Sequence, residues 1–226
     1  MSTSGRIDHL VVAAPTLDEG AAWCERTLGV DPGAGGVHPL MGTHNRLLRI
    51  ATVNHPRAYL EIIAIDPGSA GAADGRRRWF DLDDPALQAG LRAQGPRLVH
   101  WVAQVADVRA AVQAWRDLGL DPGEVVTASR PTPRGLLQWQ ITVRRDGRRL
   151  LDGCLPALIE WGDTHPAAAL PDSGVTLHGL GASHPQPQVL RAAFAAIGVE
   201  NVAVEDGSAR LCATLHTPAG PRRLSS

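Results

Sequence analysis

Hydrophobic and polar positions along the chain form two kinds of pattern, which together predict mixed helix and strand structure. Residues Ile7–Ala13 are rich in β-branched side chains, as strands are. A helix is expected over Leu17–Leu28, because Thr16 and Glu19 form a capping box at its start. Three segments that favour extended structure follow, the first an irregular stretch rich in Gly, Pro and His: Gly33–Asn45, Arg46–Thr52 and Ala58–Ile65. The predicted order is a strand, a helix and three strands.

This order returns in the second part of the chain, at a distance of about 90 residues. RIDHLVV at 6–12 resembles RLVHWVA at 97–103, and LGVDPG at 28–33 resembles LGLDPG at 118–123. The second copy has these predicted elements: a strand Leu98–Val105, a helix from Asp107 to Leu118, a hairpin of Leu137–Arg144 and Arg148–Leu151 about Asp146-Gly147, and a strand Pro156–Trp161. A repeat of this length indicates a duplicated module rather than a solenoid.

Two segments lie outside the repeat. A linker is expected to hold a short helix over Pro85–Ala93, capped by Asp83 or Asp84. After the second module a third, incomplete copy is expected: a strand Val175–Leu180, a helix Gln186–Ile197 and a hairpin of Val202–Val204 and Ala209–His216. The predicted fold class is therefore α+β. It has βαβββ modules at 5–66 and 97–163, the linker at 67–96, and an appended βαββ unit at 174–217.

Composition narrows the chemistry more than it narrows the fold. The net charge is −1, so no basic surface for nucleic acid is expected. All 22 basic residues are arginine, which excludes pyridoxal phosphate enzymes and lysine-containing phosphate loops, and no dinucleotide motif occurs. The three cysteines are far apart, which favours a reducing, cytoplasmic compartment. No segment approaches the roughly 20 apolar residues of a membrane helix.

Each module begins with a histidine on its first strand and ends with a glutamate on its last strand. The histidines are His9 and His100, and the glutamates are Glu61 and Glu160. If the modules pack as twofold mates, these four side chains are expected to meet in one cavity. Two imidazoles and two carboxylates suit a divalent ion such as Zn, Ni, Mn or Fe.

Strand alternation gives this site an apolar setting. Ile7, Val11 and Ala13 are expected on the same face as His9. An ionised glutamate in such a cavity needs a partner that offsets its desolvation, and a metal or an arginine supplies one. The alternative is that the histidines are structural and that the glutamates pair with arginines, namely Arg46, Arg49 or Arg144.

A polar turn supplies further candidates for substrate binding. His44 and Asn45 lead into an apolar strand and are placed to bond substrate oxygens, with His38 as a third member. The alternative is local turn chemistry, since Asn and Gly satisfy backbone groups in turns.

The tryptophans divide between cavity and core in the prediction. Trp139 is expected at the wall of the cavity. Trp101 and Trp161 directly follow the candidate metal ligands of their strands, so they are expected on the opposite face, in the core. Trp79-Phe80 is expected to form a lid or to pin the linker.

At these residues the chain resembles the vicinal oxygen chelate superfamily and, within it, the bacterial glyoxalase-like domain proteins. The matching segments cover nearly the whole chain: IDHLVV (7–12), HPLMGTHNRLL (38–48), YLEIIAIDP (59–67), RWFDLDDPAL (78–87), LVHWV (98–102) and LPALIEWGDTHPA (155–167). The resemblance implies paired modules around one cavity. It also implies that metal-dependent members take their ligands from the positions matched here by His9, Glu61, His100 and Glu160, with one glutamate as general base. Other members of the superfamily are metal-free binding proteins.

Two functions of different class follow from these observations. The first is a metal-assisted lyase, isomerase or dioxygenase that acts on a small oxygen-rich substrate, with Glu61 or Glu160 moving a proton. The alternative is a metal-free protein that binds or sequesters a small molecule through the tryptophans and arginines of the same cavity. A third hypothesis is a structural module with a filled interior. Neither nucleic acid nor membrane is expected as a partner, and the modules pair within one chain or are swapped in a homodimer.

Overall fold

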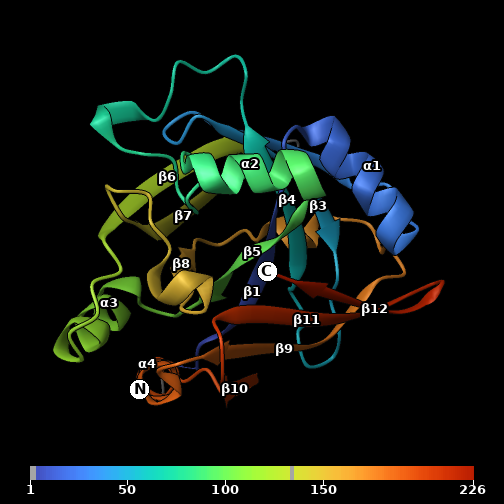
Figure 1. Ribbon diagram of the computed structural model, residues 1–226. Helices are drawn as coiled ribbons and strands as arrows, with labels where there is room; N and C mark the ends of the chain where they lie inside the picture. Colours follow the sequence, from blue (N-terminus) through green and yellow to red (C-terminus); the bar gives the residue numbers. More distant parts are fainter. Residues whose placement is uncertain (1–3, 133–134) are drawn as a thin grey trace.

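The two modules join edge to edge in an eight-stranded sheet of the computed structural model, which describes residues 4–132 and 135–226 (Figure 1). The first module contains β1 (Arg6–Ala13), α1 (Leu17–Leu28), β2 (Gly33–His38), β3 (Thr43–Arg49) and β4 (Tyr59–Ile65). The second contains β5 (Arg97–Gln104), α3 (Val108–Asp117), β6 (Glu124–Thr132), β7 (Gly135–Val143) and β8 (Ala157–Trp161). The strand order is β2-β3-β4-β1-β5-β8-β7-β6, so each module occupies one half of the sheet. The predicted α+β class is confirmed.

The joint between the halves is the antiparallel pair β1 and β5, and its register is symmetric. Leu10 lies opposite Trp101, His9 lies opposite Val102, and Val11 lies opposite His100. In each half the first strand runs parallel to the last strand of its module. Positions in the two halves can therefore be compared directly, with His9 and His100 as equivalents.

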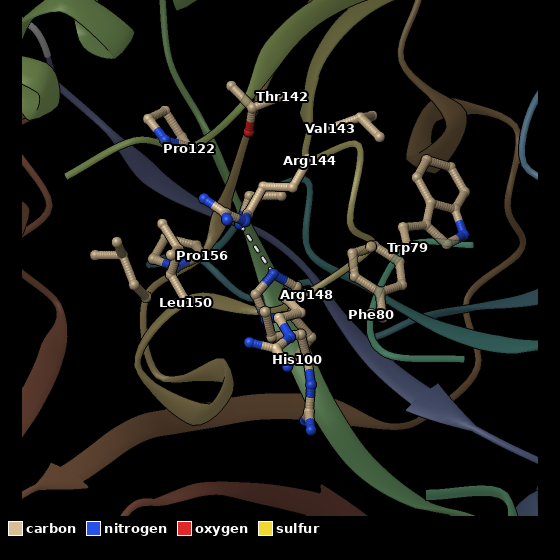
Figure 2. A pocket seen from close by; sticks show the side chains of 14 residues that line it. Trp79, Phe80, His100, Pro122, Thr142, Val143, Arg144, Arg148, Leu150 and Pro156 are labelled. Carbon is tan, nitrogen blue, oxygen red and sulfur yellow. Dashed lines mark hydrogen bonds between the residues drawn. The ribbon is translucent and has the colours of Figure 1, made fainter. Parts of the chain in front are cut away.

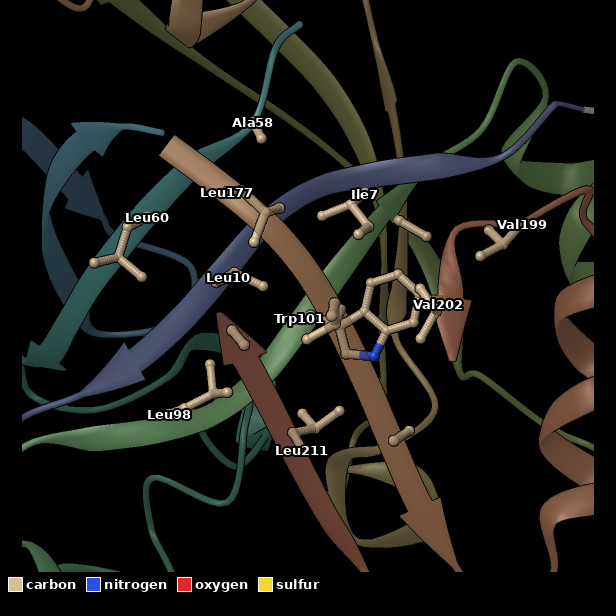
Figure 3. Packing of buried hydrophobic residues seen from close by; sticks show 14 of the residues in the cluster. Ile7, Leu10, Ala58, Leu60, Leu98, Trp101, Leu177, Val199, Val202 and Leu211 are labelled. Carbon is tan, nitrogen blue, oxygen red and sulfur yellow. The ribbon is translucent and has the colours of Figure 1, made fainter. Parts of the chain in front are cut away.

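One face of this joint forms the main hydrophobic core. Leu10, Leu98 and Trp101 point toward a second sheet and pack near its Leu177 and Leu211 (Figure 3). That sheet belongs to the C-terminal unit, which contains β9 (Thr176–His184), α4 (Pro187–Ala196), β10 (Val202–Asp206), β11 (Arg210–Thr217) and β12 (Gly220–Ser225). The apolar face of β1 and β5 is thereby removed from water, which is the main stabilising contribution of the C-terminal unit.

The other face of the joint is covered by the linker and its helix α2 (Pro85–Gln94) (Figure 1). Leu82, Leu87 and Leu91 pack there against Val11 and Val102. Trp79 and Phe80 belong to the same buried cluster. The linker therefore enters the interior between the two halves, and this decides which side chains can meet there.

Helix starts follow the local signals of the sequence. The hydroxyl of Thr16 accepts from the backbone N–H of Glu19 at the start of α1, and Gly29 ends that helix with φ 76°. Asp84 caps α2, and Asp107 caps α3. Short polar side chains that bond the free N–H groups of the first turn account for these boundaries.

The predicted hairpin about Asp146-Gly147 is wrong. β7 pairs with β6, a strand that the hydrophobic pattern did not indicate, and Arg148–Leu151 is not a strand. Asp146 instead forms a turn by accepting from the side chain of Arg144 and the backbone N–H of Arg148. The chain then enters a short 3₁₀ helix, Leu150–Gly153, in which Leu151 and Asp152 have positive φ. The turn signal was real, but a tertiary partner decided which strand β7 joins.

The C-terminal unit also differs from the prediction. β10 and β11 do not form a hairpin, because β9 lies between them in the order β10-β9-β11-β12. β12 follows beyond the predicted end of the unit at residue 217 and adds a further strand.

The expected face of Ile7 is wrong as well. A register shift between Ile7 and His9 places Ile7 in the core cluster, away from the face of Val11. Within the part of the chain described, no helix is both long enough and apolar enough to cross a membrane.

Candidate functional site

A cavity of about 440 Å³, including its open mouth, lies on the linker side of the large sheet. Most of its polar side chains come from the first half of the sheet, and its tryptophans come from the second half and the linker. The polar members are His9, His38, Asn45 and Glu61, together with Arg130 from β6. With Trp139 on its wall, the cavity brings together five of the predicted site residues in one place.

Asp8 lies directly beneath this cavity and accepts three hydrogen bonds. His9 Nδ1 lies 2.6 Å from Oδ1, while His165 Nε2 and Trp161 Nε1 each lie 2.9 Å from Oδ2. Burial acts to raise the pKa of Asp8, but the bonds and charges of His165 and His9 outweigh it and hold the pKa well below its usual range. Asp8 is therefore an anion and only accepts.

An anionic Asp8 fixes the proton on His9. Because Asp8 cannot donate, His9 carries a proton on Nδ1 and presents Nε2 to the cavity. The imidazole of His9 stacks on the ring of Tyr59, with centroids 4.5 Å apart and planes 19° apart. Burial, followed by the charges of Asp8 and Glu61, raises the pKa of Tyr59, so its ring stays neutral. The pair Asp8 and His9 is thus held rigidly at the cavity floor.

Glu61 faces His9 across the floor of the cavity. Its Oε2 lies 3.6 Å from His9 Nε2, too far for a hydrogen bond but close enough for a proton to pass through a bound molecule. Its Oε1 accepts from Asn45 Nδ2 at 2.5 Å. Only Oε2 is left free to take up a proton. Glu61 is 5% exposed, so this oxygen meets the cavity and little bulk water.

Asn45 is oriented by its neighbours. Its Oδ1 accepts from the backbone N–H of Gly36 at 2.7 Å, so its Nδ2 must face Glu61. The same Nδ2 lies 3.3 Å from His38 Nε2. A Cβ at position 35 would lie 2.1 Å from the carbonyl oxygen of Asn45. Glycine at this position therefore allows β2 to approach the site.

His38 is a neutral member of the cluster. Burial lowers its pKa to about 4; the charge of Glu61 acts to raise the pKa, and Arg130 is among the groups that lower it further. Its Nδ1 lies 3.1 Å from the hydroxyl of Thr43, and its ring meets Trp79 edge to face. His38 therefore accepts from Asn45 and fixes the amide from the other side. His44, by contrast, does not line the cavity, because it alternates with Asn45 on β3.

His100 lies in a separate pocket, which Trp79 and Phe80 also line (Figure 2). Its Nδ1 lies 3.1 Å from the carbonyl oxygen of Gly153, and its Nε2 accepts from the backbone N–H of Ala157 at 3.0 Å. Burial lowers its pKa to about 3, helped by the charge of Arg149. Both ring nitrogens are therefore engaged by backbone groups, and neither is free to bind a metal or a substrate.

Glu160 lies outside the cavity because of strand parity. In the first half Val11 pairs with Glu61, and in the second half the equivalent Val102 pairs with Ala157. The equivalent of Glu61 is thus Ala157, and Glu160 lies three positions further along β8, on the opposite face. There its Oε2 accepts from the backbone N–H of Val108 at the start of α3.

The same alternation of side chains along β8 shows that the prediction for one tryptophan was wrong. Trp161 lines the cavity instead of the core, while Trp101 is fully buried in the core as expected. Trp139 lies on the cavity wall, 5.6 Å from Trp161 between ring centroids. Trp79 and Phe80 are buried and stacked, and they separate the two pockets, which is neither of the two predicted roles in full. The positive φ of Phe80, 59°, marks the sharp turn that directs it inward.

Three residues of the site were missed from the sequence. Asp8 was passed over although it is an acid within an apolar strand, and that contrast was a usable signal. His165 and Arg130 lie far from β1 in the sequence, and nothing local indicates that they reach this site.

The donor set does not fit the predicted four-ligand metal site. His9 and Glu61 share the cavity, but His100 and Glu160 are bonded elsewhere. Over residues 4–132 and 135–226, no group of three or more His, Cys, Asp or Glu side chains is arranged to hold a metal ion. The physical reason is that the second half carries Ala157 where a fourth ligand is needed, and Phe80 packs against His100, with ring centroids 5.0 Å apart.

Comparison with known proteins gives one family and several similar structures. A family model described as a glyoxalase-like domain matches residues 7–198. A hypothetical protein from Staphylococcus aureus is 13% identical, with a TM-score of 0.56, over 91% of this chain and 87% of that chain. Methylmalonyl-CoA epimerase from Streptomyces coelicolor is 20% identical, with a TM-score of 0.43, over 73% of this chain and 99% of that chain.

The corresponding epimerase from Mycobacterium tuberculosis is 17% identical, with a TM-score of 0.38, over 72% of this chain and 91% of that chain. No curated protein matches the chain. At 13% identity the similarity to the Staphylococcus aureus protein concerns the fold alone.

Proposed function

The chain belongs to the glyoxalase-like domain family, and from that premise we propose that it is an enzyme that moves a proton on a small carbon acid, as an isomerase or a lyase does. Glu61 is the base, and His9 is its acid partner. The observation that carries this proposal is the buried row Asp8, His9 and Glu61, which ends in an open carboxylate oxygen and an open imidazole nitrogen 3.6 Å apart. A paired acid and base at the floor of a cavity are what proton transfer at carbon requires.

The proposed reaction begins with Glu61 ionised and His9 protonated on both nitrogens. Oε2 of Glu61 takes a proton from a carbon next to a carbonyl group, and the electron pair of the C–H bond moves to form an enolate. His9 Nε2 then returns a proton to the substrate, at the same carbon or at a neighbouring atom. Glu61 is now protonated and His9 neutral, so one proton that passes between them restores the starting state.

In this cycle Asp8 is hydrogen-bonded to the acid, His9, and Asn45 is hydrogen-bonded to the base, Glu61. The anionic Asp8 stabilises the protonated form of His9 through the bond to Nδ1. Asn45 donates to Glu61 Oε1, which favours the ionised form and leaves Oε2 as the acceptor. Each member of the pair therefore has a neighbour that fixes its orientation through a hydrogen bond.

The isomerase or lyase part of the sequence prediction is retained, and the metal-assisted and dioxygenase parts are not used. Those parts depend on His100 or Glu160 joining His9 and Glu61, and both are bonded elsewhere. The proposed reaction therefore uses only the side chains of this cavity.

A metal-free binding protein is the second candidate. The aromatic walls formed by Trp139 and Trp161 favour it, because such walls hold planar ligands without chemistry. A direct hydrogen bond between His9 and Glu61 would also favour it, since their charges would then be spent on each other. The 3.6 Å separation is longer than such a bond, which supports the enzyme instead.

Hydrogen–deuterium exchange at carbon tests the proposal without knowledge of the natural substrate. α-Ketobutyrate and its methyl ester both carry acidic C–H bonds next to a carbonyl group, and exchange in D₂O is followed by proton NMR. The wild type should exchange at least one of them faster than buffer does. Glu61→Gln should lower the enzyme-dependent rate by about 10²- to 10⁴-fold.

The matched control is Glu160→Gln, which changes the glutamate outside the cavity and should leave the exchange rate unchanged. Bound probe without any exchange above buffer would refute the enzyme and support the binding protein. Equal losses for the two variants would refute the assignment of the base.

A further inference from the structure

Two residues that line the cavity each carry a hydrogen-bond donor without a partner among the described residues. Five buried side-chain nitrogens lack a hydrogen bond within the described residues, and two of them, Arg130 Nη1 and Trp79 Nε1, belong to residues that line this cavity, although Trp79 also borders the His100 pocket. Buried donors without partners are rare in folded proteins, because each loses its bonds to water and gains none in return. Two such donors at one cavity indicate a missing acceptor.

The charge of Arg130 indicates what kind of acceptor is missing. No carboxylate lies within ion-pair distance of Arg130 among the described residues, and Glu61 is already bonded to Asn45. An arginine held at a buried cavity without a counter-ion favours an anion there. The lowered pKa of His38, to which the positive charge of Arg130 contributes, agrees with this electrostatic effect.

The backbone makes room for this guanidinium. A Cβ at position 36 would lie 1.7 Å from Arg130 Nη1, so any residue other than glycine would displace the arginine. β2 also has an irregular register between Ala34 and Val37, where it passes Arg130. The same short segment therefore fits two side chains of the site, since Gly36 also donates to Asn45.

The indole of Trp79 is suited to the same acceptor. Its nitrogen lies on the side away from the His100 pocket (Figure 2), while the ring is held by stacking on Phe80 and by the edge contact with His38. An indole N–H donates and cannot accept, and a guanidinium does the same. Both groups therefore select for oxygen acceptors.

We propose that Arg130 and Trp79 bind the carboxylate of the substrate, so that the substrate class is a small carboxylic acid with an acidic C–H bond. This inference rests on the proposed function for the role of Glu61, but its binding part is independent of catalysis. The carboxylate lies at Arg130, the apolar body of the acid lies against Trp139 and Trp161, and the carbon that loses its proton faces Glu61.

Calorimetric titration with α-ketobutyrate and with its methyl ester tests the inference, because the ester lacks the negative charge and differs otherwise by a single methyl group. The wild type should bind the acid more tightly than the ester, by about 10- to 100-fold. Arg130→Gln should remove this preference and leave ester binding unchanged. Trp79→Phe keeps an aromatic ring without the N–H and should weaken acid binding by about 3- to 10-fold.

Arg46→Gln is the matched control. Arg46 also has a buried nitrogen without a partner, but it alternates with Asn45 and Leu47 on β3 and does not line the cavity. This variant should bind the acid as the wild type does. Thermal unfolding of each variant shows whether it is folded, and Trp79→Phe provides a second variant if Arg130→Gln is not.

Several outcomes would overturn the inference: equal affinity for acid and ester, equal losses in Arg130→Gln and Arg46→Gln, or no binding of the acid at millimolar concentration. The proposed function fails separately. If the acid binds through Arg130 but its C–H bonds do not exchange faster than in buffer, the anion site stands and the catalytic proposal falls. If both probes exchange and bind equally, the catalytic proposal stands and the anion site falls.

Discussion

The two halves of the large sheet share a backbone plan but carry opposite chemistry. Around the symmetric β1–β5 joint, Asp8 in the first half corresponds to Val99 in the second, and Glu61 corresponds to Ala157. Continuing the register to the next strand, Asn45 corresponds to Ile141. The polar cluster of one half is thus replaced by apolar side chains in the other, and only the equivalent histidines remain.

This difference shows how a duplicated fold can lose one site and keep another. In the first half each buried polar group has partners: Asp8 accepts three bonds, and Asn45 uses its oxygen and its amino group. In the second half the only equivalent that remains polar, His100, is satisfied by backbone groups, and Phe80 of the linker packs against it. Buried polar side chains are thus found in the half where they have hydrogen-bond partners, and apolar side chains occupy the equivalent positions in the other half.

The largest expected effect comes from making the first half resemble the second. Asp8→Val introduces the residue found at the equivalent position and leaves the N–H groups of His9, His165 and Trp161 without their acceptor. We expect a loss of about 4 kcal/mol in the free energy of unfolding, measured with urea. Val99→Ala, at the equivalent position, should cost about 2 kcal/mol through lost packing alone. A loss for Asp8→Val no larger than that for Val99→Ala would contradict the assignment of Asp8 as the hub of the cluster.

An acid titration compares one buried histidine from each half. The pKa of His100 is lowered to about 3 and that of His38 to about 4, from 6.5. Below pH 6.5 the unfolded chain therefore binds protons at these histidines that the folded chain does not bind. The free energy of unfolding falls as the pH drops from 6.5 toward the lowered pKa values. Each histidine should account for about 2 kcal/mol between pH 7 and pH 5.

The effect is measured as a difference in unfolding free energy at the two pH values. Replacing either histidine, by His100→Gln or His38→Gln, should reduce the pH-dependent loss by that amount. Asp8 acts in the same direction, because its pKa is also lowered in the folded protein, but its contribution is lost only below its usual pKa of 3.8 and lies outside this window. A pH dependence unchanged in His100→Gln would show that this ring is not held neutral.

The smallest expected effect concerns Glu160, the glutamate of the second half that does not correspond to Glu61. Glu160 accepts from the N–H of Val108 at the start of α3, where Asp107 already caps two further N–H groups. Glu160→Ala should lower the unfolding free energy by about 1 kcal/mol, measured with urea, and leave exchange at carbon unchanged. If Glu160→Ala instead lost exchange to the degree expected for Glu61→Gln, Glu160 would belong to the catalytic site, and the contrast drawn between the two halves would be wrong.

Much of the fold was predictable, because its signals are local and repeated. The capping residues Thr16 and Asp107, and Gly29 at the end of its helix, acted as their types usually do. The strand pairings were less predictable. Asp146-Gly147 forms a turn as its sequence indicates, but the partner of β7 is β6, because pairing is decided by contacts between distant strands.

The candidate site shows the same division. His9, His38, Asn45, Glu61 and Trp139 were proposed from the sequence, and the structure places all five at one cavity, while their roles stay predictions. From the sequence, Glu160 was paired with Glu61 because each is the glutamate on the last strand of its module, whereas the register of the sheet makes Ala157 the equivalent of Glu61. The error is three positions, which is an odd number. Because side chains alternate between the two faces of a strand, a shift by an odd number of positions places the side chain on the other face.

The sequence by itself determined that this protein is a duplicated α+β fold with polar residues directed into an apolar interior, since spacing and side-chain type carry that information locally. Only the tertiary structure decided that the polar groups gather in one half, that Phe80 separates His100 from them, and that Arg130 reaches them from β6. The reason is that side chains distant in the sequence meet only through the register of neighbouring strands and the path of the linker. Neither the register of the strands nor the path of the linker is encoded in any single segment of the sequence.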